Sequence, residues 1–314
     1  MDAASALCNM CSRREAFFFR PYSGMKLCMR CFAESVEKKV RATISEYKMF
    51  RFDDRVAVAV SGGKDSVGLL HVLARIERGY PRTELAAVTV DEGIMGYRDE
   101  ALDIAAENCK ELGVPHHVFS FKELFGQTLD EIVTSLKEKS ITEPTICAYC
   151  GVLRRKALNV AARKIGAVMV ATAHTLDDEV QTLLLNIFHG DVLRIAKEKP
   201  VTDEVHPKLV RRIKPFCQVP ERETALYAYV KGVRLQSKSC PYAGDALRND
   251  ARAMLNALER KHPGIKFTIF RSIERVRPAL EGLARAEGLG ECAECGEPTT
   301  GRVCRTCEMR RQLG

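Results

Sequence analysis

Three cysteines in the middle of the chain have the types and spacing of an open metal centre. Cys147 and Cys150 form a CxxC pair, and we expect Cys240, which precedes a proline, to join them. Three thiolates on one centre leave a coordination position free, and a free position is where chemistry can occur. A metal-free interpretation stays open, in which one of these cysteines carries a persulfide and another resolves a disulfide.

Eight of the other cysteines form two complete four-thiolate sets, one near each end of the 314-residue chain. Each set consists of two CxxC pairs, the spacing of a closed tetrahedral zinc site that supports a fold. The ligands expected for two Zn²⁺ ions are Cys8, Cys11, Cys28 and Cys31, and Cys292, Cys295, Cys304 and Cys307. Cys109 and Cys217 stand alone. A zinc ion shared by the three central cysteines and His174 is a weaker alternative.

The composition is ordinary for a globular protein, with 46% hydrophobic and 29% charged residues. No apolar run approaches the length of a membrane span, and the N-terminus lacks a basic region followed by an apolar one. We therefore expect a cytoplasmic protein with reduced thiols and no membrane contact. The use of cysteines in CxxC pairs also favours metal binding over disulfides.

The net charge of +8 is unevenly distributed. Residues 194–222 carry eight Lys and Arg against four Asp and Glu, and Arg154, Arg155 and Lys156 form a second cluster. Such runs are either solvated surface or a footprint for a phosphate backbone. The residues predicted to contact RNA are Arg154, Arg155, Arg211, Arg212 and Lys214.

Strands and helices alternate through the middle of the chain. Apolar runs predict strands at 55–60, 85–90, 116–121 and 167–172. Helical periodicity predicts helices at 34–47, 67–78, 97–112, 151–165, 176–188, 221–231 and 246–261. The alternation predicts an α/β fold, a parallel sheet wrapped by helices, whose ligand lies beyond the carboxyl ends of the strands. The charged, proline-marked segment 195–217 is expected to be an irregular connection.

The hexapeptide Ser61-Gly62-Gly63-Lys64-Asp65-Ser66 directly follows the first of these strands and opens a helix. Glycines allow a backbone to approach a ligand closely, and a helix N-terminus offers free N–H groups to an anion. Lys64 adds a positive charge, and Asp65 or Ser66 can cap the helix. The segment therefore predicts a phosphate-binding loop, although its spacing differs from GxxxxGK[ST].

SGGKDS resembles the signature of the PP-loop ATP pyrophosphatases. Three further segments resemble the tRNA uridine 2-sulfurtransferases within that family, the group that includes the cytosolic tRNA thiouridylases. They are Cys147–Arg155, Thr172–Glu179 with Asn186 and Gly190-Asp191, and Cys240-Pro241-Tyr242. The chain departs from the pattern at Ala173-His174-Thr175, where relatives read GHN, and at Arg154, where some have a catalytic lysine. An arginine stays protonated, so we expect Arg154 to position phosphate or tRNA.

The resemblance implies adenylation of a uridine C2 oxygen by ATP with Mg²⁺, followed by displacement with sulfur. It implies a 4Fe–4S cluster on Cys147, Cys150 and Cys240, loaded by a ubiquitin-like thiocarboxylate carrier or by inorganic sulfide. Lys64 and Asp178 are the other expected catalytic residues. Predicted ATP-binding residues are Ala59, Val60, Ser61, Gly62, Gly63, Lys64, Asp65, Ser66, Val90, Asp91, Thr172 and Asp178. For Asp91, capping of a helix or turn is as good an interpretation as nucleotide binding. At Asp177 and Asp178, capping of the helix N-terminus is the alternative to a functional role.

We divide the chain into an N-terminal zinc module (1–35), a linker helix (36–51), an ATP-binding and catalytic domain (52–275) and a C-terminal zinc module (276–314). The N-terminal module is expected to have a core separate from that of the phosphate loop. The expected protein is a homodimer acting on the tRNA wobble uridine. Alternatives are the T-loop uridine and, from another class, a non-catalytic zinc-stabilised RNA-binding scaffold.

Overall fold

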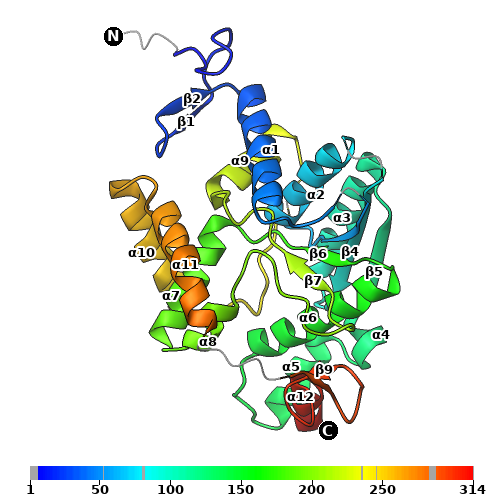
Figure 1. Cartoon of the computed structure of the whole chain (residues 1–314). Helices are drawn as coiled ribbons and strands as arrows, with labels where there is room; N and C mark the ends of the chain where they lie inside the picture. The colour runs from blue at the N-terminus through cyan, green and yellow to red at the C-terminus, as the bar shows by residue number, and fades with distance from the viewer. Residues whose placement is uncertain are drawn as a thin grey trace.

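A five-stranded parallel sheet forms the centre of the structure (Figure 1). The computed structural model describes residues 6–51, 53–79, 82–234, 236–244, 246–282 and 288–313. Parts of the two expected zinc modules, residues 1–5, 283–287 and 314, lie outside the described residues. The strand order is β5-β4-β3-β6-β7. The strands are β3 Arg55–Ala59, β4 Glu84–Asp91, β5 His116–Ser120, β6 Met169–Ala171 and β7 Arg211–Ile213.

Four of these strands confirm the expected ones, and the fifth corrects the prediction of an irregular connection. Within 195–217 the structure has the edge strand β7 and the end of a short helix. β7 pairs in parallel with β6, from Met169 opposite Arg211 to Ala171 opposite Ile213. This three-residue strand contains two arginines and so has no apolar run that would predict a strand. It is recognised as part of the sheet only by its pairing with β6.

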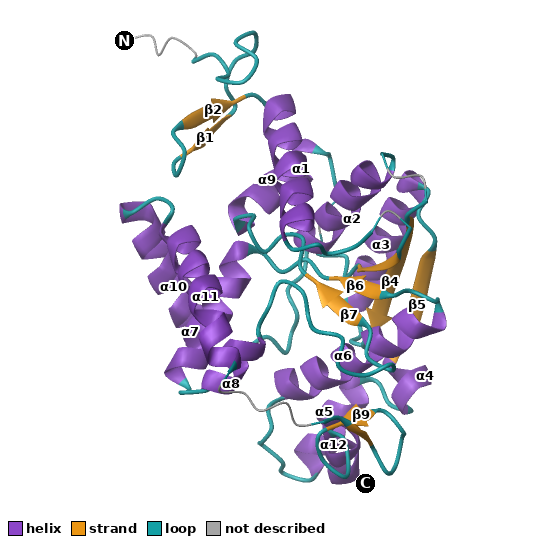
Figure 2. Cartoon of the chain, viewed as in Figure 1, coloured by secondary structure: helices purple, strands orange, loops and turns teal. Residues whose placement is uncertain are grey.

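Helices cover both faces of the sheet (Figure 2). Their bounds are α1 Met29–Glu46, α2 Lys64–Glu77, α3 Arg98–Leu112, α4 Phe121–Phe125, α5 Leu129–Glu138, α6 Ile146–Lys164, α7 Leu176–Phe188, α8 Val192–Lys197, α9 Glu221–Val230, α10 Ala246–Lys261, α11 Ile265–Glu281 and α12 Arg305–Leu313. All seven expected helices are confirmed. Within the part of the chain described, no helix is long and apolar enough to span a bilayer.

The two faces of the sheet belong to different apolar cores, because side chains alternate along a strand. Val56 and Val58 of β3 face a core built with α1, α2, α3 and α9. Ala57, between them, faces the alanine-rich side of α6, including Ala161 and Ala162. The small residues on this second face let α6 lie close to the strands, so α6 is fixed relative to the carboxyl edge of the sheet.

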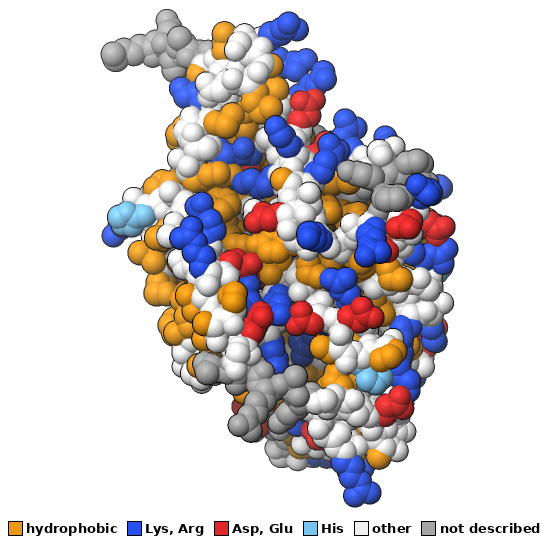
Figure 3. Space-filling model, viewed as in Figure 1, with side chains coloured by type: hydrophobic (Ala, Val, Ile, Leu, Met, Phe, Trp, Pro, Cys, Tyr) orange, Lys and Arg blue, Asp and Glu red, His pale blue; other side chains and the backbone are white. Residues whose placement is uncertain are grey.

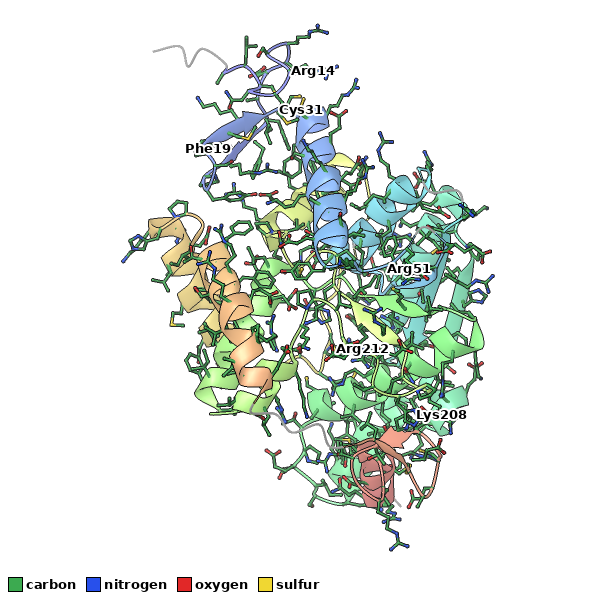
Figure 4. The ribbon with its side chains drawn as sticks, viewed as in Figure 1. Arg14, Phe19, Cys31, Arg51, Lys208 and Arg212 are labelled. Carbon is green, nitrogen blue, oxygen red and sulfur yellow. The ribbon has the colours of Figure 1, made fainter. Side chains whose placement is uncertain are left out.

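The N-terminal module shares the core of the main domain, and the expectation of a separate core is wrong. It consists of the hairpin β1 Phe18–Arg20 and β2 Met25–Leu27 with the start of α1, where Figure 4 marks Cys31. Cys31 belongs to the same apolar cluster as Val67 of α2. A buried ion pair adds a polar link, since Arg20 contacts both carboxylate oxygens of Glu223 on α9 at 3.1 and 2.8 Å.

The C-terminal module lies at the opposite end of the molecule (Figure 1). It contains the two-residue strands β8 Gly290–Glu291 and β9 Pro298–Thr299 and the helix α12. Met309 of α12 is buried in the apolar cluster that also holds Leu153 of α6. The two modules therefore contact different helices of the main domain.

Loss of the Arg20–Glu223 pair should destabilise the whole protein. Arg20→Ala would leave the Glu223 carboxylate, 2% exposed, without its cation. We expect the free energy of unfolding to fall by about 3 to 5 kcal/mol in urea denaturation. The control is Arg30→Ala, which removes an exposed pair with Glu34 and should cost about 1 kcal/mol or less. Equal effects of the two variants would contradict a shared core.

Candidate functional site

The predicted phosphate loop connects β3 to α2 and is held open by its own hydrogen bonds. Ser66 Oγ accepts from the Ser61 amide at 3.0 Å and donates to the Gly63 carbonyl at 2.9 Å. Gly63 is the N-cap of α2 and supplies no side-chain cap. The first amides of α2 therefore remain available to an anion, with the helix dipole behind them.

Gly62 lets the loop approach α3 more closely than any side chain would allow. Its φ is +85°, and a Cβ built on it would lie 2.5 Å from the carbonyl oxygen of Ala101. Both the backbone conformation and the contact therefore require glycine.

A cleft of about 430 Å³ lies beside this loop. Nine of the predicted ATP-binding residues line it: Ala59, Val60, Ser61, Gly63, Asp65, Ser66, Val90, Thr172 and Asp178. Six further residues complete the wall: Val88, Glu92, Arg154, Leu158, Ala173 and His174. The cleft meets the carboxyl ends of β3, β4 and β6, the position expected for a ligand of such a sheet.

Three predicted ATP-binding residues do not line the cleft. Gly62 faces α3, and Asp91 accepts a hydrogen bond from the Gly93 amide at 2.8 Å, which is a turn-capping contact. Lys64 contacts Asp65 at 2.7 Å and Glu221 at 2.8 Å, and it borders a second cavity with Glu221. Burial lowers the pKa of Lys64, but the two carboxylates outweigh burial and raise it. Lys64 therefore stays charged behind the loop.

Asp178 caps a helix and also lies in the wall of the cleft. It is the third residue of α7 and forms a capping box with Thr175, whose amide and hydroxyl donate to its carboxylate at 2.9 and 2.8 Å. The same residue lines the cleft. Its neighbour Asp177 instead accepts from the Glu221 amide at 2.7 Å and pairs with Lys266.

The three central cysteines come together where α6 begins. Thr145 caps this helix, so the CxxC pair occupies its first turn, with Cys147 exposed and Cys150 buried. Cys240 packs against the apolar cluster that contains Cys150. The Cys147 thiol donates to the Tyr242 carbonyl at 3.2 Å, which joins the helix to the loop carrying Cys240.

The three central thiols are not gathered as closely as the thiols of the terminal sets. Zinc–sulfur bonds of about 2.3 Å place tetrahedral sulfurs ~3.8 Å apart. The four sulfurs of each terminal set lie within 4.8 Å of one another, as one zinc ion requires. Among the described residues, the central three and His174 form no group within that limit. The central residues therefore lack the preformed single-ion spacing that both terminal sets have.

Arg154 connects the cysteines to the nucleotide cleft. Its guanidinium donates to Cys150 Sγ at 3.0 Å and pairs with Glu92 at 3.2 Å. Burial raises the pKa of the Cys150 thiol, and the Arg154 charge opposes that rise. Glu92 also pairs with the buried Arg98 at 2.8 Å, and Arg98 donates to the Ser61 carbonyl at 3.0 Å. One chain of contacts therefore runs from the phosphate loop to a cysteine sulfur.

The five predicted RNA contacts separate into two groups. Arg154 and Arg155 lie side by side on α6, and Arg212 donates to the Arg155 carbonyl at 3.4 Å. Arg211 points the other way from β7 and borders a cavity at the amino end of the sheet. Lys214 is buried and pairs with Glu179 at 2.9 Å and with Glu198 at 3.3 Å. Its charge is balanced within the protein.

Positive charge is not gathered into one patch on the face shown in Figure 3, where Lys and Arg alternate with Asp and Glu. Figure 4 places Arg212 near the middle of this face, on β7. The group formed by Arg154, Arg155 and Arg212 therefore stands out by its position beside the cleft rather than by the amount of charge. Burial lowers the pKa of Arg212, and the charge of Arg155 lowers it further.

Sequence reasoning missed Glu92, Arg98 and Ala173 as parts of this site. Glu92 directly follows the second strand of the parallel sheet, so its position at a carboxyl end was a usable signal. Arg98 begins a helix and gave no such signal. Cys109 and Cys217 are buried, burial raises the pKa of both thiols, and neither belongs to a metal-ligand group among the described residues.

Comparisons with known proteins agree with this arrangement. A family model for the PP-loop domain matches residues 32–258. The chain is 37% identical to the tRNA 2-thiolation protein NcsA of Haloferax volcanii, over 96% of this chain and 97% of the relative. It is 34% identical to the cytoplasmic tRNA 2-thiolation protein 1 of Schizosaccharomyces pombe, over 99% and 92%.

A solved structure is also similar over nearly the whole chain. It is the U34-tRNA thiolase NcsA from Methanococcus maripaludis with its [4Fe-4S] cluster. The TM-score is 0.83 at 33% sequence identity, and the match covers 98% of this chain and 96% of the other.

The contact of Gly62 with Ala101 gives a prediction with a matched control. Gly62→Ala should both strain the backbone and collide with α3, so nucleotide affinity should fall at least tenfold in equilibrium titration. Gly126→Ala has a nearly equal φ, +83° against +85°, but open space around the new methyl group. It should cost only about 1 to 2 kcal/mol of stability and leave nucleotide affinity unchanged. Unchanged nucleotide affinity in Gly62→Ala would refute the need for close approach.

Proposed function

The chain belongs to the PP-loop family and, within it, to the tRNA 2-thiolation proteins, and on this premise we propose that it is an ATP-dependent tRNA uridine 2-sulfurtransferase. The observation that carries the proposal is the position of Arg154. Its side chain lines the nucleotide cleft and contacts the sulfur of Cys150. Arg154 therefore borders both the cleft proposed to bind ATP and a cysteine proposed to take part in sulfur delivery.

In the first step the uridine C2 oxygen attacks the α-phosphorus of ATP, and pyrophosphate leaves. The amides at the start of α2 stabilise the charge on the phosphates. Lys64 contributes its charge after its side chain leaves Glu221. Asp65 and Asp178 are carboxylates at the cleft and are the proposed oxygen ligands of Mg²⁺.

In the second step sulfur attacks C2, the C2–O bond breaks, and AMP leaves with the former uridine oxygen. Cys147, Cys150 and Cys240 are the proposed ligands of a 4Fe–4S cluster. When bound, such a cluster supplies an iron without a protein ligand, where sulfide can be held. Arg154 donates to Cys150 and so stabilises its thiolate form. The second candidate is a metal-free mechanism, in which one of the same three cysteines would accept sulfane sulfur from a persulfide donor, with release of the donor thiol, and another would resolve a disulfide.

The proposed substrate position is the wobble uridine of tRNA, with the T-loop uridine as the alternative. The similar enzyme of Methanococcus maripaludis, a U34-tRNA thiolase, supports the wobble position. Arg154, Arg155 and Arg212 are the proposed contacts to tRNA phosphates. The sulfur donor is a thiocarboxylate carrier or inorganic sulfide. A non-catalytic RNA-binding scaffold would not explain why Arg154 contacts both the cleft and Cys150.

Each terminal four-cysteine set is proposed to hold one Zn²⁺, because its sulfurs are close enough to share a tetrahedral ion. We further propose a cytoplasmic homodimer. The name of the Schizosaccharomyces pombe relative supports the compartment. Exposed apolar side chains at the end of α7 and the start of α8, including Phe188 and Leu193, support self-association.

The cysteine assignment is tested by iron content and thiolation together. Protein prepared without oxygen should contain about four irons and four labile sulfides per chain. Cys147→Ala, Cys150→Ala and Cys240→Ala should each lose iron and 2-thiouridine formation, measured by mass spectrometry of digested tRNA. Cys109→Ala and Cys217→Ala are the matched controls and should keep both.

Lys64→Ala should show the opposite split, because it alters phosphate stabilisation and not the cysteines. Iron should be retained, while release of pyrophosphate from ATP in the presence of tRNA should be lost. An iron-free enzyme that thiolates tRNA in the presence of a chelator would refute the cluster and favour the persulfide.

The arginine group is tested by the salt dependence of tRNA binding. Arg155→Ala with Arg212→Ala should reduce the slope of log K against log salt by roughly 0.7 to 0.9 for each lost phosphate contact. Arg211→Ala, the neighbour that points away from the cleft, is the control and should leave the slope unchanged. An equal change in both variants would place the tRNA elsewhere.

A further inference from the structure

The helix that carries Cys147 and Cys150 is held by the last helix of the chain. α12 packs against α6 and α5, as seen near the C-terminus in Figure 1. Met309 of α12 is 2% exposed and lies in the same apolar cluster as Tyr149 and Cys150. The C-terminal module therefore contributes to the apolar cluster against which the first turn of α6 packs.

Tyr149 connects the CxxC turn itself to the module. It lies within the sequence Cys147-Ala148-Tyr149-Cys150 and is fully buried. Its hydroxyl donates to the side-chain carbonyl of Gln312 at 2.5 Å. A buried ring fixed at its outer end limits rotation of the first turn of α6, because Tyr149 and both cysteines lie within four consecutive residues.

Further contacts continue along α6 toward its C-terminus. The Lys156 ammonium donates to Cys295 Sγ at 3.1 Å, and Arg163 pairs with Glu297. Lys208, marked beside the module in Figure 4, donates to the Gly296 carbonyl at 2.9 Å. Two side chains of α6 thus reach the loop that carries the module's cysteines, and one touches a sulfur directly.

The first turn of a helix needs such support, since helix ends open more readily than their centres. Among the described residues, the start of α6 has the Thr145 cap at 3.3 Å, the bond from Cys147 to the Tyr242 carbonyl and the contact of Arg154 with Cys150 Sγ at 3.0 Å. Cys147 itself is exposed. None of these contacts holds the Tyr149 side chain, which lies between the two cysteines in the sequence.

We infer that the C-terminal four-cysteine module is a positioning element for Cys147 and Cys150, acting through Met309, Tyr149 and Gln312. What the cysteines do rests on the proposed function, but their positioning is a property of the chain alone. The N-terminal module has a different target: it contacts α9, whose Glu221 holds Lys64. The N-terminal module therefore packs near the lysine of the phosphate loop, and the C-terminal module packs near the central cysteines.

Hydrogen–deuterium exchange of the full-length, iron-free protein tests the inference without enzyme turnover. Tyr149→Phe removes one hydrogen bond and should speed exchange of residues 146–153 about fivefold. Met309→Ala leaves a cavity and should speed it about thirtyfold or more. Alkylation of Cys147 should accelerate in the same order. Arg310→Ala, an exposed neighbour on α12, is the control and should change neither rate.

Exchange of α2, which carries the phosphate loop, should stay at the wild-type rate in all three variants. Uniformly faster exchange would mean that the module only stabilises the fold and would overturn the inference, as would wild-type exchange of 146–153 in both Tyr149→Phe and Met309→Ala. If Met309→Ala does not fold, Tyr149→Phe still decides. Iron binding distinguishes the two proposals: faster exchange in a protein whose wild type never binds iron refutes the cluster and keeps the positioning role.

Discussion

The site depends on one buried carboxylate. Glu92 is 6% exposed and lies between two guanidinium groups, Arg98 on the side of the phosphate loop and Arg154 on the side of the cysteines. A buried charge is tolerated only when it is paired, so the three side chains fix one another. The distance between the proposed nucleotide site and the proposed sulfur site is thereby set by an ion triad, independently of any bound ligand.

The two terminal four-cysteine modules extend this arrangement to the ends of the chain. One reaches α9 through Arg20 and Glu223, and the other reaches α6 through Met309. Because they contact separate helices, damage to one module should disturb one half of the site first. The modules are thus parts of a single architecture, even though cysteine spacing alone made them resemble independent appendages.

The sequence predicted most of the elements and the two terminal groups of four cysteines, because apolar runs and CxxC spacing are local signals. It missed α4 and α5 even though capping boxes stood in the sequence, Ser120 with Glu123 and Thr128 with Glu131. It could not show that Lys64 faces Glu221, since that contact joins residues 157 positions apart. The surroundings of the basic residues were least predictable, because charge runs do not reveal on which side of a strand a cation lies or with which carboxylate it pairs.

The edge strand β7 has a consequence for how the protein behaves in solution. An open sheet edge is a template on which strands of other molecules can add. Here Val201 already occupies part of that edge through an antiparallel bridge to Ile213. Arg211 and Arg212 place a positive charge on each face of the strand, so identical edges repel each other. Arg212, a proposed tRNA contact, and Arg211, which points away from the cleft, thus both discourage aggregation, and replacing both with apolar residues would expose the sheet edge to strand addition by other molecules.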